Sequence, residues 1–325
     1  MEKAVTVDNI LENIGKVRIA VIGDVCLDVY WTADMKKSVL SRETPHHPLP
    51  MVEEKMSPGG AANVIMNALA LKPEKVYAVG VTGADWRADA LRKLLENAGA
   101  DLSGLITDEK RVTNTYIKPI RMGISDVMYE DPRLDFENHS LLSEETEEKL
   151  LKALSSIDSD VYCVSDQMLF GCITEKIRNT LIEMGKSGKT VIVDSRDRIH
   201  LYSSVIVKPN EVEAARAVEA SGSYSDIALR LSEKNGRPAI VTLGSEGCIV
   251  TENGKAIPVP ARKVTGEIDI VGAGDTFLSA VSLAYAAGAS LPEAALFANT
   301  ASAVTVKKLR TTGTASKEEI KKLYR

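Results

Sequence analysis

Short apolar runs alternate with longer segments of helical periodicity through most of the chain. The runs end at glycine or polar residues and include VRIAVIG (17–23), DVYCVS (160–165), TVIVDS (190–195), SVIVKPN (204–210) and PAIVTLG (238–244). Between several of them, apolar positions recur at helical spacing, as in ITEKIRNTLIEMGKSG and YSDIALRLSEKNG. Strands that alternate with helices favour an α/β fold, with a mostly parallel sheet flanked by helices.

Two segments interrupt this rhythm, at about 29–56 and 111–139. Both show polar and apolar residues in alternation, with prolines, and read as short exposed antiparallel strands. Together they would form a small antiparallel β lid on the main domain. The alternative is a pair of long surface loops, although loops of that length are uncommon in compact domains. No repeat, low-complexity tract or linker is evident, so residues 1–325 are expected to form a single domain.

Composition narrows the range of function. The net charge is −5, which argues against a nucleic-acid binder with a broad basic surface. No run approaches the roughly 18 apolar residues that cross a bilayer, and the N-terminus lacks signal-peptide features. The 4 cysteines form no C-x-x-C pair, and three of them lie in apolar runs, which predicts buried reduced thiols in a cytoplasmic protein. With only 4 histidines and no H-E-x-x-H, a zinc site is not expected.

Polar residues follow the predicted strands. Ligands of open α/β sheets bind beyond the carboxyl ends of the strands. The residues that stand there are Asp24, Asp28, Asp166, Asp194, Asn210 and Thr242.

The segment DIVGAGDTF (269–277) carries the strongest chemistry. Gly272, Ala273 and Gly274 allow a ligand to approach the backbone, and the helix that follows supplies free N–H groups, so the segment predicts an anion hole for a phosphoryl group. Asp275 beside that hole would be the general base that takes a proton from a substrate hydroxyl. Alone, the segment is equally read as a turn before a helix with an N-terminal aspartate.

Two further segments are candidates for a nucleotide site. In SVIVKPNEVEA, Asn210 and Glu213 would face a nucleotide if a helix starts there, with Glu213 ordering a water-bound Mg²⁺. The alternative is an asparagine cap with an acidic first turn. In VTLGSEG (241–247) the glycines permit close approach of a ribose or base, or else mark a plain strand–turn–strand. No G-x-G-x-x-G follows the first strand, so a nicotinamide site has little support.

Three motifs in order, SPGGAANVIMNALAL, KPNEVE and DIVGAGDTF, resemble those of the ribokinase-like (PfkB) family of carbohydrate kinases over nearly the whole chain. Within that family the chain is most similar to the subgroup that phosphorylates heptose 7-phosphate at its anomeric position. The stretches VIGDVCLDVYW, SRETPHHPLPMVEEKMSPGGAANV, PRLDFEN, VSD and VDSR carry this likeness. The resemblance implies a ribokinase-like fold and transfer of the γ-phosphate of ATP to a sugar hydroxyl, with Mg²⁺ and a monovalent cation such as K⁺.

The resemblance also implies roles for particular residues. Asp275 would be the base, and Gly272, Ala273 and Gly274 the anion hole. Asp269 would help to hold the monovalent cation, with backbone groups of 304–313. The residues implied for ATP are Asn210, Glu213, Thr242, Gly244, Gly247 and Asn299. Those implied for the sugar are Asp24, Asp28, Gly59, Gly60, Asn63, Arg133 and Asp166, with Gly59 and Gly60 as the hinge of the lid.

Some features depart from the family pattern. His46 and His47 replace small or apolar residues, and Val271 stands where threonine is frequent. The subgroup's bifunctional members carry a second, nucleotidyl-transferring domain after the kinase, and no H-x-G-H stretch is found here. The cations considered for a substrate phosphate are Arg42, Lys118, Arg121, Arg133, Arg196 and Arg198, with Arg133 preferred.

Several alternatives stay open from the sequence. The acceptor could also be a fructose phosphate, ribose or a keto-deoxy sugar acid. A non-catalytic sugar or nucleotide sensor on the same fold is disfavoured because it would have no need of Asp275. A homodimer that pairs through the lid sheets is the expected partner arrangement.

Overall fold

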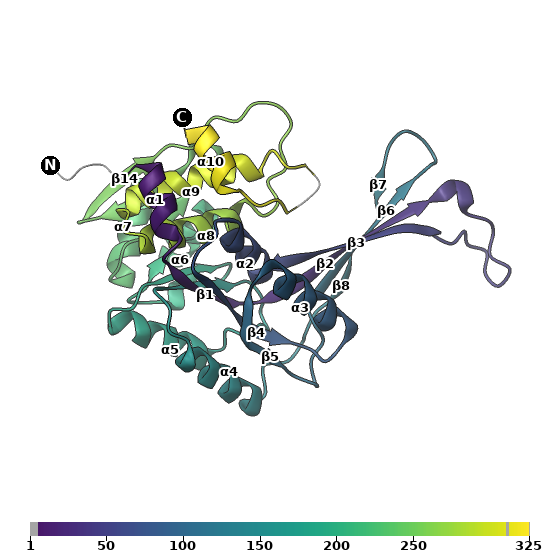
Figure 1. Ribbon diagram of the computed structural model, residues 1–325, viewed down its shortest axis with the longest axis horizontal. Helices are drawn as coiled ribbons and strands as arrows, with labels where there is room; N and C mark the ends of the chain where they lie inside the picture. Colours follow the sequence, from purple (N-terminus) through teal and green to yellow (C-terminus); the bar gives the residue numbers. More distant parts are fainter. Residues whose placement is uncertain (1–5, 310–311, 325) are drawn as a thin grey trace.

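A parallel six-stranded sheet forms the centre of the computed structural model, which describes residues 6–309 and 312–324 (Figure 1). The strand order is β11-β10-β9-β1-β4-β5, and every neighbouring pair is parallel. The strands are β1 (Arg18–Gly23), β4 (Lys75–Thr82), β5 (Asp101–Thr107), β9 (Val161–Asp166), β10 (Val191–Ser195) and β11 (Ile206–Val207). The α/β class predicted from the alternating pattern is confirmed.

Alternate residues of the central strand β1 enter two different cores, as expected for a strand covered on both faces. Ile19 and Val21 pack in one core with α1 (Val7–Ile14), α2 (Ala61–Ala70), α3 (Trp86–Ala98), α8 (Ala273–Ala286), α9 (Leu291–Thr305) and α10 (Lys317–Tyr324). Ala20 and Ile22 pack in the other with α4 (Glu144–Ser156), α5 (Glu175–Lys186), α6 (Glu211–Val218) and α7 (Tyr224–Asn235).

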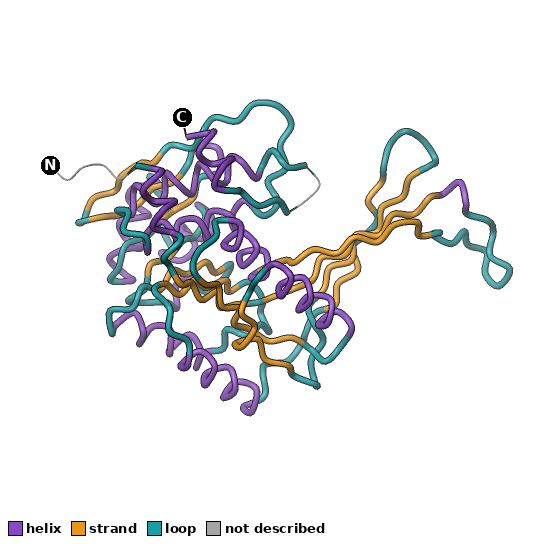
Figure 2. The backbone as a smooth tube through the Cα atoms, in the orientation of Figure 1, coloured by secondary structure: helices purple, strands orange, loops and turns teal. Residues whose placement is uncertain are grey.

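A second sheet projects from this body (Figures 1 and 2). Its strands are β2 (Val25–Asp34), β3 (Met51–Gly60), β6 (Thr115–Met122), β7 (Tyr129–Glu130) and β8 (Leu134–Phe136). β2 pairs with β3, and β6 with β7 and β8, in antiparallel fashion, whereas β2 and β6 are parallel. The two segments that interrupt the α/β pattern therefore form a small sheet, and the alternative of two long surface loops is wrong. A single residue, Asp24, separates the end of β1 from the start of β2, so the chain passes directly from the central sheet into this lid sheet.

A small antiparallel sheet extends the central one beyond β11. It contains β12 (Ile240–Thr242), β13 (Cys248–Glu252) and β14 (Lys255–Val259), and bridges at Val207–Ala239 and Asn210–Thr242 connect it to β11. Three 3₁₀ turns complete the elements, at Met35–Lys37, Ile199–Leu201 and Gly244–Glu246.

The four cysteines are buried and unpaired, as predicted from the three that lie in apolar runs and the lack of a C-x-x-C pair. Within the ranges that the structure describes, no helix is both long enough and apolar enough to cross a bilayer.

Candidate active site

Most of the polar residues predicted at strand ends do lie at the carboxyl edge of the central sheet. Asp24 follows β1, Asp166 ends β9, and Asp194 lies in β10 opposite Ser165. Asn210 and Thr242 face each other across an isolated parallel bridge. The edge to which sequence reasoning assigned the ligand site therefore collects these groups.

Asp275 stands in the first turn of α8, held by a side chain from a distant part of the chain. Asn63 Nδ2, on α2, donates a hydrogen bond of 2.7 Å to Asp275 Oδ2. Gly272 caps the helix with φ +79°, in the left-handed region, and a Cβ there would lie 2.8 Å from Asn63 Nδ2. Glycine is required at 272 both for the backbone conformation and for this close approach.

The first turn of α8 also presents free donors. Ala273 N–H donates to Ile270 O, and Thr276 N–H donates to Gly272 O. Across the described ranges, the N–H groups of Gly274 and Asp275 have no hydrogen-bond partner, and no atom lies within 4 Å of where a Cβ at Gly274 would stand. An open helix N-terminus with unpaired N–H groups is suited to bind an anion.

The pKa of Asp275 is raised from 3.8 to about 7, chiefly because the carboxyl is removed from water. The hydrogen bond from Asn63 and the charge of Lys208 oppose the rise, whereas Asp194 and Asp28 add to it. A carboxylate with a pKa near neutrality is suited to accept a proton from a hydroxyl group.

A buried ion pair lies behind this carboxylate. Lys208 Nζ is 3.0 Å from Asp194 Oδ2, and both side chains are almost fully buried. Its charges act on Asp275 and also on Glu213, whose pKa is raised mainly by burial. Lys208 was not predicted as a site residue, although a lysine at the buried end of IVKPN was the available signal.

Asn210 and Glu213 form a capping box at the start of α6. Asn210 Oδ1 accepts from the N–H groups of Val212 and Glu213, and Glu213 Oε2 accepts from Asn210 N–H. The cap alternative therefore describes the geometry of this motif. One carboxylate oxygen, Glu213 Oε1, has no hydrogen bond in the described part of the chain, which fits a residue that would hold Mg²⁺ through water.

The other residues implied for ATP are partly engaged elsewhere. Asn299 Nδ2 donates to the carbonyl oxygens of Val259 at 3.2 Å and Pro260 at 3.1 Å, so this amide nitrogen anchors the end of β14. Gly247 has φ +101° and packs against Val259 and its neighbours, which makes it a structural glycine. Gly244 faces open space, and Thr242 is partly exposed at the end of β12.

Asp24 and Asp166, which the sequence assigns to the sugar, both bind groups of their own chain. Asp24 is buried and accepts the N–H groups of Gln167, Met168 and Cys172, at 2.7 to 3.0 Å. Asp166 is also buried, and its carboxylate accepts from Arg198, Ser195 Oγ and Tyr202 Oη. Asp24 accepts three hydrogen bonds from the loop after β9, and Asp166 binds Arg198, so both carboxylates help to position that loop.

The remaining sugar residues lie at the junction of the lid sheet and the body. Asp28 is mostly buried on β2, 3.6 Å from Lys118 Nζ on β6, and its pKa is raised by burial. A Cβ at Gly59 would lie 2.7 Å from Cys26 Sγ and 3.1 Å from Asp28 Oδ2. Gly60, with φ +55°, is the N-cap of α2, so this glycine pair connects the lid strand β3 to the helix that carries Asn63.

A cavity of about 370 Å³ opens between the lid sheet and the loop before α8. Lys118 and Tyr30 line it from the lid, and Asp269 and Val271 line it from the loop. Asp269 Oδ1 accepts from Val271 N–H at 3.0 Å, and Asp269 N–H donates to Val306 O at 2.8 Å. The loop predicted to hold a monovalent cation is thus tied to part of 304–313, of which residues 310 and 311 lie outside the described ranges.

The cations considered for a substrate phosphate differ in availability. Arg133, the preferred one, is bound to Asp135 by two 2.6 Å hydrogen bonds and stacks on Tyr116. Arg121 pairs with Asp131 at 2.6 Å. Lys118 alone of this set lines the lid cavity, and Arg42 and Arg196 are exposed. No group of three or more His, Cys, Asp or Glu side chains is placed to hold a metal ion in the described ranges.

Comparison with known proteins assigns the chain to a family. Residues 17–318 match the pfkB family carbohydrate kinase. The protein named bifunctional protein HldE from Desulfatibacillum aliphaticivorans is 31% identical over 319 residues, covering 94% of this chain and 62% of that protein. HldE from Nitrosococcus oceani is 34% identical over 317 residues, with 92% and 62% covered. The chain thus spans about 62% of the length of these curated relatives.

Solved structures share the fold. Arabidopsis thaliana ribokinase complexed with ribose and ATP superposes with a TM-score of 0.68 at 19% identity, covering 95% of this chain and 99% of that one. Escherichia coli phosphofructokinase-2 in complex with substrates and products gives a TM-score of 0.74 at 21% identity, with 95% and 98% covered.

Proposed function

The chain belongs to the pfkB family of carbohydrate kinases, and we propose that it transfers the γ-phosphoryl group of ATP to the anomeric hydroxyl of D-glycero-D-manno-heptose 7-phosphate. The observation that carries the proposal is Asp275, whose pKa of about 7 combines with its place beside an open helix N-terminus. Asp275 Oδ2 is held by Asn63, so Oδ1 is the atom that takes the proton from the attacking hydroxyl.

The N–H groups of Gly274 and Asp275 would receive the charge that develops on the transferred phosphoryl group. Glu213 would hold Mg²⁺ through water, and that ion supplies neutralisation of the ATP phosphates when bound. A monovalent cation at the Asp269 loop would stabilise the same end of α8, in line with Escherichia coli phosphofructokinase-2, solved in complex with potassium. Closure of the lid sheet would exclude water, so that ATP is not hydrolysed.

The acceptor is proposed from two lines of support. Stretches such as SRETPHHPLPMVEEKM resemble the heptose 7-phosphate kinases, and the relatives at 31% and 34% identity are HldE proteins. The second line is Lys118, a cation that lines the cavity between the lid and Asp269 and would bind a sugar phosphate there in place of its 3.6 Å contact with Asp28.

We also propose that residues 1–325 act as one kinase domain and that two copies pair through their lids. The lid exposes apolar side chains on β3 and β7, among them Met51 and Tyr129. Exposed apolar patches of this kind commonly mark interfaces. Light scattering after gel filtration would give twice the monomer mass, and Met51→Lys with Tyr129→Lys would return the mass of one chain.

Release of ADP from Mg-ATP, measured against a panel of acceptors, tests the proposed function. The panel contains both anomers of heptose 7-phosphate, fructose 6-phosphate, ribose and a keto-deoxy sugar acid. Turnover confined to one heptose 7-phosphate anomer supports the proposal. Faster turnover on another acceptor would leave the kinase and refute the heptose assignment.

A further inference from the structure

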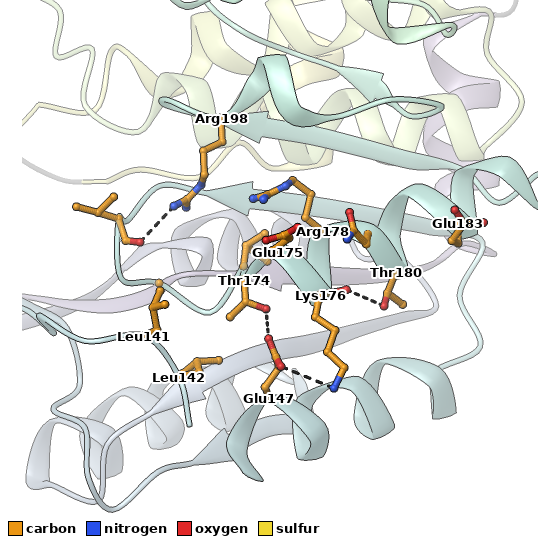
Figure 3. A pocket seen from close by; sticks show the side chains of 14 residues that line it. Leu141, Leu142, Glu147, Thr174, Glu175, Lys176, Arg178, Thr180, Glu183 and Arg198 are labelled. Atoms are coloured by element: carbon orange, nitrogen blue, oxygen red, sulfur yellow. Dashed lines mark hydrogen bonds and ion pairs between the residues drawn. The ribbon is translucent and has the colours of Figure 1, made fainter. Parts of the chain in front are cut away.

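A second cavity, of about 840 Å³, lies on the α4–α5 side of the central sheet, away from α8. It is bounded by the start of α4, by α5 and by the loop that follows β9, with Arg198 reaching in from the segment after β10 (Figure 3). None of the residues implied for ATP or for the anion hole lines it.

Arg178 on α5 is the unusual group in this cavity. The residue is only 9% exposed, and its guanidinium stacks on the Tyr202 ring at 6.0 Å. Among the described residues, its guanidinium has no hydrogen-bond partner and no carboxylate within ion-pair distance. The side chain is mostly covered, while its guanidinium nitrogens open into the cavity, where an anion would supply the missing counter-charge.

Arg198 supplies the second cation. Its guanidinium binds Asp166 and the carbonyl oxygens of Met168, at 2.7 Å, and Leu169, at 3.3 Å. Asp166 neutralises Arg198, so no carboxylate of this cluster remains for Arg178. In Figure 3 the guanidinium of Arg178 points toward Arg198, whose own guanidinium is directed to a carbonyl oxygen on the far side.

The acidic residues of the cavity do not cancel this charge. Glu147 accepts from Thr174 Oγ1 and lies 3.8 Å from Lys176 Nζ, so its carboxylate is occupied at the α4 side. Glu175 is exposed at the start of α5, and Glu183, also exposed, pairs with Lys186 at 2.7 Å. The cavity therefore has an inner end at which Arg178 carries the uncompensated charge beside the Arg198–Asp166 pair, and a mixed outer rim.

We propose that Arg178 and Arg198 form a second binding site, separate from the catalytic centre, for a small molecule that carries a phosphate or carboxylate group. Guanidinium groups match the planar or tetrahedral oxygens of such anions with paired hydrogen bonds. Leu141 and Leu169, both exposed at the rim, provide apolar surface for the rest of the molecule.

This site is connected to the catalytic edge by hydrogen bonds. Arg198 binds Asp166 and the carbonyl groups of 168 and 169, and the N–H groups of 167, 168 and 172 donate to Asp24. An occupant that draws Arg198 toward itself alters the loop that Asp24 holds. We expect it to change KM for the acceptor sugar more than kcat.

Isothermal titration of inorganic phosphate tests the site. The protein is first saturated with Mg²⁺ and a non-hydrolysable ATP analogue, so that the anion hole is filled. We expect one phosphate per chain and at least tenfold weaker binding in Arg178→Gln. Arg178→Lys should retain part of the affinity, and Arg230→Gln, an exposed arginine on α7, should bind as the unmodified protein does.

Asn179→Asp is a second variant that tests the site even if Arg178→Gln does not fold. Asn179 is exposed at the cavity rim, and an added carboxylate there repels phosphate. The variant should weaken phosphate binding with an unchanged melting temperature. The proposal would be overturned if the saturated protein bound no phosphate. It would also be overturned if Asn179→Asp and a folded Arg178→Gln both bound phosphate as tightly as the unmodified protein does. Displacement of phosphate by the acceptor sugar would overturn it as well.

Discussion

Replacing Asp275 by asparagine should abolish turnover and yet stabilise the protein. Asparagine keeps the shape of the side chain, and its oxygen can still accept the 2.7 Å hydrogen bond from Asn63. It cannot take a proton from the acceptor hydroxyl. Loss of a general base costs about 10²- to 10⁴-fold in rate, which corresponds to about 3–5 kcal/mol in the activation barrier. KM for ATP should change only a few-fold, because the N–H groups of the helix start remain.

The stability effect follows from the pKa of Asp275, which rises from 3.8 to about 7 on folding. The folded state holds this proton more tightly than the unfolded state, so the protein loses stability as pH rises from about 4 to 7. At 1.36 kcal/mol per pKa unit the loss is at most about 4 kcal/mol, and less because the side chain is partly exposed. Asparagine carries no charge and does not suffer this loss.

The assay combines kcat with denaturant unfolding of both proteins between pH 4 and 9. The variant should gain stability over the unmodified protein up to pH 7, and the difference should then stay constant. Asp226→Asn is the matched control, since Asp226 occupies the same third position of α7 but is exposed. An inactive variant that is equally destabilised at every pH would refute the reasoning, because it would indicate a structural defect. So would a variant that retains turnover.

Three further predictions follow from the same site. The logarithm of kcat/KM should fall with unit slope below about pH 7, because Asp275 must be deprotonated to act as base, and a flat profile between pH 5 and 8 would contradict this. Lys208→Met should lower the free energy of unfolding by about 3–5 kcal/mol and move the acidic limb of that profile to higher pH, since Asp194 then keeps an unpaired buried charge. Adding Asp194→Asn should restore most of the free energy of unfolding, measured by chemical denaturation, and most of the original position of the acidic limb, measured in rate assays. Gly272→Ala should cost about 1–2 kcal/mol of stability for its left-handed backbone and reduce kcat, because the new Cβ would stand 2.8 Å from Asn63 Nδ2. Unchanged kcat would exclude that contact as a determinant of activity.

The periodicity of the chain was sufficient to predict the sheet, because a strand buried on both faces must be apolar throughout and its covering helices must show one apolar face. The lid strands were predictable from alternation, which is typical of a strand with one covered and one exposed face. The parallel β2–β6 pairing was not predictable, since it joins strands about ninety residues apart and depends on how β2 leaves the central sheet.

The site was only partly predictable. Gly272 and Gly274, before Asp275, indicate an anion hole because they leave the backbone at the helix start open to a ligand. The contact of Asn63 with Asp275 spans 212 positions and has no local signal. Asp24 and Asp166 stand at strand ends, as ligand residues do, and the sequence carries no sign of their hydrogen bonds to the loop after β9 and to Arg198. Lys208 was missed because a lysine beside a strand is usually exposed, whereas here Asp194 compensates its charge in the interior.

The most direct test of the central claim is phosphorus NMR of the reaction of Mg-ATP with D-glycero-D-manno-heptose 7-phosphate. The account predicts a new phosphate signal coupled to the anomeric proton, formed with one ADP per sugar and absent with Asp275→Asn. Inorganic phosphate and ADP without a new sugar phosphate, or a phosphate on any other hydroxyl, would contradict it.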